Sequence, residues 1–144
     1  MQLIEEEMVT LAALMRHVMS FDGLSTDERR AALAEASRAL GLLAGDVRIV
    51  SNDRAGYRDA AHVVEAITTG LDGWIERAKN EVRNDDLRRR AARVRDGDKR
   101  VAMLRAVEVL ARHGELRRPE RLFLGWLADF WGVPSVIESY ELDP

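Results

Sequence analysis

Apolar residues recur every three or four positions along most of this chain, and very little interrupts them. The prolines are confined to positions 119, 134 and 144, so long stretches carry no residue that breaks a helix. This spacing gathers apolar side chains on one face of an α-helix, whereas a half-buried strand alternates with a period of two. The pattern therefore predicts an all-α fold.

Polar caps, glycines and one proline delimit the predicted helices. Ser25 and Glu28 have the spacing of a capping box, and Asp98 is placed to cap a later helix. Pro119 suits a first helical turn, and Gly132 closes that helix. We expect helices near 3–20, 26–40, 44–50, 56–69, 73–95, 99–112 and 119–131, with 134–144 as a short helix or frayed tail.

Two of these helices carry most of the expected core. The helix over 99–112 is apolar around most of its circumference, which predicts a position at the centre of the core. Its thin polar stripe consists of Arg105, Glu108 and Arg112. The helix over 3–20 has a wider polar side, formed by Glu6, Thr10, His17 and Ser20.

A weak internal repeat relates the two ends of the chain. Residues 3–42 align with 94–133 without a gap, so that Gly23 falls on Gly114. Each copy describes a buried helix, a glycine turn and an amphipathic helix, and neither hairpin can bury its apolar face alone. We therefore expect a compact multi-helix bundle of two pseudo-symmetric hairpins plus middle helices, forming a single domain over 1–144.

Composition excludes several classes of protein. Hydrophobic residues make up 47% of the chain and charged residues 33%, which is a globular balance. The absence of cysteine excludes disulfides, thiolate zinc sites and a cysteine nucleophile. Acidic residues at 5–7 replace the basic start of a signal peptide, and no apolar run approaches a membrane span. These features predict a cytoplasmic protein without a membrane span.

Catalytic signatures are missing from the sequence. His17, His62 and His113 lie far apart along the chain, and no His-Glu-x-x-His, Gly-x-Ser-x-Gly or Ser-x-x-Lys motif occurs. No glycine loop of the kind that cradles phosphates is present either. We therefore expect neither an enzyme nor an organic cofactor.

The two predicted bends carry the pattern FDGLSTDE over residues 21–28 and HGELRRPE over 113–120. A small-residue helix, an acidic glycine turn, an acidic cap and a second helix ending in Leu-Gly-Leu resemble the tellurite-resistance TerB-like family. The resemblance covers both ends of the chain and implies a helical bundle that acts with protein partners in stress responses. It also implies a divalent metal held by clustered acidic side chains.

The resemblance places a candidate metal site on the two bends. Carboxylates suit Ca²⁺ or Mg²⁺, whereas the histidine that replaces the family's usual aspartate shifts the site toward Zn²⁺ or marks its loss. In the alternative interpretation these acids are architectural, with Glu28 returning a hydrogen bond to Ser25. The candidate metal ligands are Asp22, Asp27, Glu28, His113, Glu115 and Glu120.

The resulting hypothesis is a non-catalytic interaction module that binds protein partners and a divalent ion. One alternative is a small metal-dependent enzyme that uses the same acids with His113 as general base. Another is a nucleic-acid binder that uses an arginine cluster, although the net charge of −3 is untypical of that class. The cluster consists of Arg88, Arg89, Arg90, Arg93 and Arg95, and a solvated, ion-paired face is the simpler interpretation.

Four aromatic residues in the predicted helix over 119–131 are candidates either for the core or for a surface that binds a partner. Their helical spacing predicts that they belong to the core, whereas an exposed Trp131 would mark a surface for a partner. They are Phe123, Trp126, Phe130 and Trp131.

Overall fold

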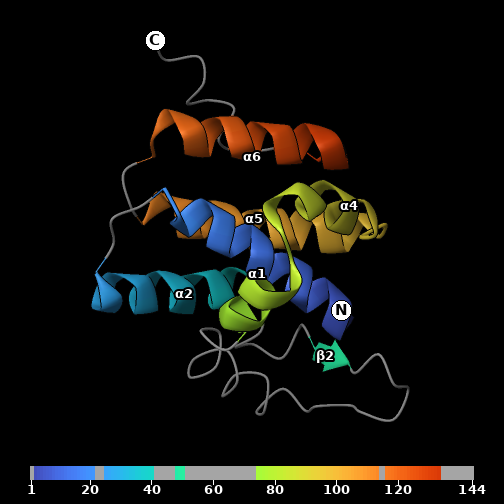
Figure 1. The fold of residues 1–144 in the computed structure, drawn as a ribbon, viewed down its shortest axis with the longest axis horizontal. Coiled ribbons are helices and arrows are strands. Elements are labelled where there is room, and N and C mark those ends of the chain that lie inside the picture. Colours follow the sequence, from blue (N-terminus) through green and yellow to red (C-terminus); the bar gives the residue numbers. More distant parts are fainter. Residues whose placement is uncertain (1, 22–24, 41–47, 51–73, 114–115, 134–144) are drawn as a thin grey trace.

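The computed structural model describes residues 2–21, 25–40, 48–50, 74–113 and 116–133. Helices dominate this part of the chain, which confirms the predicted all-α class (Figure 1). None of the described helices combines the length and the apolar content needed to cross a bilayer. The helices are α1 (Glu5–Met19), α2 (Thr26–Leu40), a helical stretch over 74–81, α4 (Leu87–Ala92), α5 (Gly97–Arg112) and α6 (Arg118–Trp131).

The helices lie in three layers (Figure 1). α6 forms one outer layer, α2 forms the other, and α5 lies between them and contacts α1, α2 and α6. α2 and α6 begin at the left in Figure 1, where α5 ends. The central position predicted for residues 99–112 agrees with these contacts, and the pseudo-dyad between the two hairpins stays a prediction.

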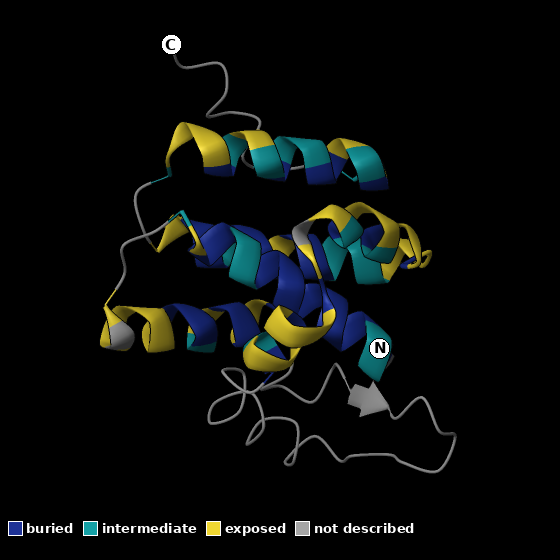
Figure 2. Ribbon diagram, in the orientation of Figure 1, coloured by how far each residue is buried: buried dark blue, intermediate teal, exposed yellow. Residues whose placement is uncertain are grey.

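α1 is as deeply buried as α5. Every residue from 7 to 15 is buried, and Figure 2 shows most of the helix in dark blue. The prediction of a polar side was wrong at Thr10, whose hydroxyl donates to the carbonyl oxygen of Glu6 at 3.0 Å and is thereby satisfied within the helix. Glu108 on α5 is also buried, so the polar stripe expected there is reduced to Arg105 and Arg112.

A short parallel strand pair was not predicted. β1 (Gln2–Ile4) pairs with β2 (Arg48–Val50), with Leu3 opposite Ile49. The helix expected over 44–50 was therefore wrong at its last three residues, and α1 begins at Glu5 rather than at residue 3. The helix expected over 56–69 and the tail 134–144 lie outside the described residues.

The long helix expected over 73–95 is broken. Helical residues end at 81, and a 3₁₀ turn at Asn84–Asp86 precedes α4. Asn and Asp side chains compete for backbone hydrogen bonds and favour turns over helix interiors. The next cap also differs from expectation, because Asp96 rather than Asp98 accepts from the first backbone amides of α5, at 2.8 and 3.2 Å.

The acidic start of α1 is tied to three later segments. Carboxylates in a first helical turn are favoured by the helix dipole, and here each one also meets a cation. The pair of Glu7 with Lys99 is the most shielded from solvent, since its side chains are 11% and 21% exposed. The pairs are Glu5 with Arg77 at 3.7 Å, Glu6 with Arg93 at 2.6 Å and Glu7 with Lys99 at 2.9 Å.

Candidate functional site

The helix ends that flank the two predicted bends lie at one end of the molecule (Figure 1). The first turn of α2 carries Asp27 and Glu28, and the first turn of α6 carries Glu120. These turns belong to the two outer layers, with the end of α5 in the layer between them. Asp22 and Glu115 lie outside the described residues.

Glu28 and Glu120 serve the helices on which they lie. The Ser25 amide donates to Glu28 Oε1 at 3.4 Å, and the Glu28 amide donates to Ser25 Oγ at 3.3 Å. The predicted capping box is thus confirmed. Glu120 acts in the same way, because its Oε1 accepts from the Arg117 amide at 3.3 Å. The two carboxylates differ in their surroundings, since Glu28 is exposed and Glu120 is fully buried.

His113 has a role that the sequence did not suggest. It is the C-cap of α5, and its Nε2 pairs with the carboxylate of Glu35 on α2. Glu35 was not among the candidate residues, because nothing in the sequence relates position 35 to position 113. The contact makes His113 a link between the two helices that pack against each other in the core.

The candidate metal ligands do not form a donor set within the described residues. No group of three or more histidine, aspartate or glutamate side chains is arranged there to hold an ion. Glu28, Glu120 and His113 have the partners given above. The architectural interpretation thus accounts for these three side chains.

The two capping carboxylates predict different effects on stability. Glu28→Ala should lower the free energy of unfolding by about 0.5–1 kcal/mol, as for an exposed cap. Glu120→Ala should lower it by about 1–3 kcal/mol, because the Arg117 amide loses its acceptor in a partly buried place and the buried Glu120 side chain leaves a gap. Urea unfolding followed by circular dichroism measures both values. An increase in stability for Glu28→Ala would contradict the capping role. That result is expected instead for a cluster of metal-binding carboxylates, because removal of one carboxylate relieves their mutual repulsion.

The four aromatic residues of α6 separate into two groups. Trp131 is 3% exposed, and its indole nitrogen donates to the carbonyl oxygen of Ala91 at 2.9 Å. The prediction of a core position is confirmed for this residue. Phe123, Trp126 and Phe130 are partly buried and pack against the edge of the core.

Together with Leu122, these three partly buried side chains form what we call the aromatic face of α6. Leu122 is 59% exposed, which makes it a large aliphatic side chain left in solvent. The ring centroids of Phe123 and Trp126 are 5.8 Å apart, and those of Trp126 and Phe130 are 5.3 Å apart and stacked. Residues three, four and seven apart lie on one side of a helix, so the aromatic face is a continuous stripe.

Side chains from α1 extend the aromatic face. The His17 ring lies 4.5 Å from the Phe123 ring and 5.2 Å from the Phe21 ring, measured between centroids. These contacts join the end of α1 to the outer layer formed by α6. The stripe of rings therefore runs across two helices rather than along one.

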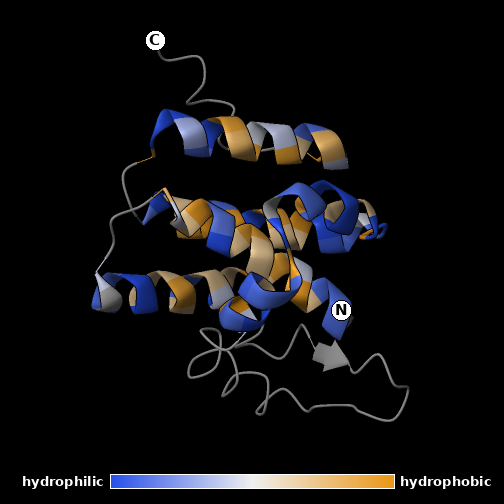
Figure 3. Cartoon of the chain, in the orientation of Figure 1, coloured by the Kyte–Doolittle hydropathy of each residue, from blue (hydrophilic) through white to orange (hydrophobic). Residues whose placement is uncertain are grey.

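Arginine lies at the other end of the aromatic face. The Arg88 guanidinium is 5.6 Å from the centroid of the Phe130 ring, within the range of a cation–π contact. α4, which supplies it, is largely hydrophilic in Figure 3. Two other members of the predicted cluster have acidic partners, because Arg89 pairs with Asp86 at 3.8 Å and Arg93 with Glu6. Most of the cluster is exposed, as a solvated, ion-paired face requires.

Comparisons with known protein families, with curated proteins and with solved structures found no match. The aromatic face and its arginine are thus interpreted from their own geometry and chemistry.

Proposed function

We propose that this chain is a non-catalytic helical interaction module whose partner binds the aromatic face of α6. The observation that carries the proposal is Leu122, 59% exposed beside three partly buried rings on an outer helix. Contiguous apolar patches of this kind mark interaction sites on soluble proteins. Tryptophan and arginine are also the residue types that most often dominate binding energy.

The chemistry at the edge of the aromatic face indicates the kind of partner. Arg88 stacks over Phe130, and Arg118 is exposed at the start of α6. We propose a protein segment that presents apolar side chains beside acidic ones. An exposed leucine favours a protein over a nucleic acid, because single-stranded nucleic acids are bound by stacking on rings and by backbone cations.

The resemblance to the TerB-like family supports the same class of function. It implies a protein that acts with partners in stress responses, and we keep both features as parts of the proposal. What supports them is the helical fold and the sequence of the two bends.

Divalent metal binding stays a prediction. Titration calorimetry with Ca²⁺, Mg²⁺ and Zn²⁺ tests it. Asp22→Ala is the variant, and Asp129→Ala, at an exposed position of α6, is the control. Binding below millimolar concentration that Asp22→Ala removes would support a metal site. If no ion binds in that range, the metal site and the metal-dependent enzyme are both excluded.

Site-specific cross-linking tests the proposed surface. A photoreactive amino acid at position 126 should form an adduct with a partner protein in cells, whereas the same amino acid at position 105, exposed on α5, should not. The captured protein is then purified and its affinity for the unlabelled chain is measured. Adducts that are the same from both positions, or that contain nucleic acid alone, would contradict the proposal.

A further inference from the structure

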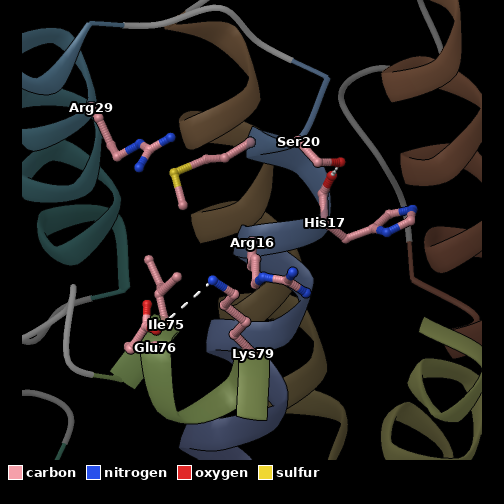
Figure 4. A pocket seen from close by; sticks show the side chains of 8 residues that line it. Arg16, His17, Ser20, Arg29, Ile75, Glu76 and Lys79 are labelled. Carbon is pink, nitrogen blue, oxygen red and sulfur yellow. Dashed lines mark hydrogen bonds and ion pairs between the residues drawn. The ribbon is translucent and has the colours of Figure 1, made fainter. Parts of the chain in front are cut away.

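A pocket of about 310 Å³ lies where α1, α2 and the helical stretch over 74–81 meet. Its apolar wall includes Met19 and Ile75, and no residue of α6 lines it. His17 contributes to the lining, but Figure 4 shows its ring pointing away from the other side chains, toward Phe123. The pocket thus adjoins the aromatic face through His17 alone among the described residues, and none of the four residues that define that face lines it.

Three cationic side chains from three different elements line this pocket. Arg16 comes from α1, Arg29 from the first turns of α2 and Lys79 from the stretch over 74–81 (Figure 4). Glu76 is the one acid among the described lining residues, so these residues, His17 aside, carry a net charge of +2.

The acid neutralises little of this charge. Lys79 Nζ lies 3.9 Å from Glu76 Oε1, and both side chains are more than half exposed, a geometry that contributes little to stability. Within the described residues, Arg16 and Arg29 form no salt bridge. Their guanidinium donors are therefore available to a ligand.

From this arrangement we infer that the pocket binds a phosphate monoester. A guanidinium offers donors in a planar fork that matches two phosphate oxygens at once. Two such groups and one ammonium, offset by the Glu76 carboxylate, give a net charge of +2 that matches a dianion. The volume is at the low end for small-molecule sites, so it suits a phosphoryl group on a small body. Met19 and Ile75 give that body an apolar wall.

The same group can reach the pocket from two sources, a free phosphate ester or the headgroup of phosphatidic acid. Titration calorimetry with glycerol 3-phosphate tests the first. Co-sedimentation with phosphatidic acid vesicles, compared with phosphatidylcholine vesicles, tests the second. Each assay uses the full chain, and thermal unfolding confirms that every variant is folded.

Arg16→Gln and Arg29→Gln should each weaken binding about tenfold or more, because each removes a charge-assisted contact. Arg38→Gln is the matched control, since Arg38 is exposed on α2 and does not line the pocket. Loss of binding in Arg16→Gln and Arg29→Gln, but not in Arg38→Gln, supports the inference. The assay in which binding is lost identifies the source of the phosphate monoester. Absence of saturable binding in both assays, or an equal loss in Arg38→Gln, would overturn it. Neither result bears on the aromatic face.

Discussion

Replacement of Trp131 by alanine is expected to lower the free energy of unfolding by about 3–5 kcal/mol, the range for a large aromatic side chain removed from a core. The side chain is 3% exposed and packs in the main core cluster. Its indole nitrogen also donates to the carbonyl oxygen of Ala91, and the variant loses this hydrogen bond, although that oxygen keeps the Val94 amide as a donor. Urea unfolding at constant pH measures the loss.

Trp126 on the same helix is the matched control. Its side chain lies at the edge of the core, partly exposed, so Trp126→Ala should cost much less than Trp131→Ala. Trp131→Phe keeps most of the buried area and isolates the hydrogen bond, which should account for about 0.5–1.5 kcal/mol, because the Ala91 oxygen keeps the Val94 amide as a donor. Equal losses for Trp126→Ala and Trp131→Ala would show that the two tryptophans are equally part of the core and that the aromatic face does not exist.

The second large effect concerns the partner. Trp126→Ala should weaken the complex with the cross-linked protein about 30-fold or more, because hot-spot residues contribute about 2 kcal/mol or more and tryptophan is enriched among them. Trp126 lies in the middle of the aromatic face, between the rings of Phe123 and Phe130. Titration calorimetry with the purified partner measures the change.

Two further variants show whether the loss is local. Leu122→Ser should also weaken the complex, since it removes the most exposed apolar side chain. Arg38→Ala, on α2 in the opposite outer layer, should leave the affinity unchanged. If Arg38→Ala weakens binding as much as Trp126→Ala, the partner does not bind at α6.

Helix boundaries were predictable wherever a local signal marks them. α2 and α5 end where expected, and α6 begins with Pro119 in its first turn and ends at Gly132 in the left-handed conformation. The strand pair was not predictable, because the pairing of Leu3 with Ile49 depends on a contact across more than forty residues. The break before the 3₁₀ turn at Asn84–Asp86 was missed because apolar periodicity continues through it.

Burial of single polar residues was harder to predict. Thr10 and Glu108 have polar side chains, and periodicity alone places them on the solvent-exposed side of their helices. The structure buries both, since a neighbouring helix covers each face. A helix in the middle layer is enclosed from several sides, and its own sequence does not say how many neighbours it has.

The candidate site was predicted in part. The capping roles of Ser25 and Glu28 follow from their spacing and are confirmed. The distinction between Trp131 and Trp126 was not predictable, because helical spacing gives a stripe without showing which part of it a neighbour covers. The lining of one pocket by Arg16, Arg29 and Lys79 was also beyond the sequence, since the three residues belong to separate elements.

The most direct test of the aromatic face is the fluorine-19 spectrum of the chain labelled with 5-fluorotryptophan, recorded while the purified partner is added. The three tryptophans report on different places, because Trp74 and Trp131 are buried and Trp126 is partly exposed. We expect the Trp126 signal to move with saturation while those of Trp74 and Trp131 stay in place. A shift confined to Trp74 or Trp131, with the Trp126 signal unchanged, would contradict the account.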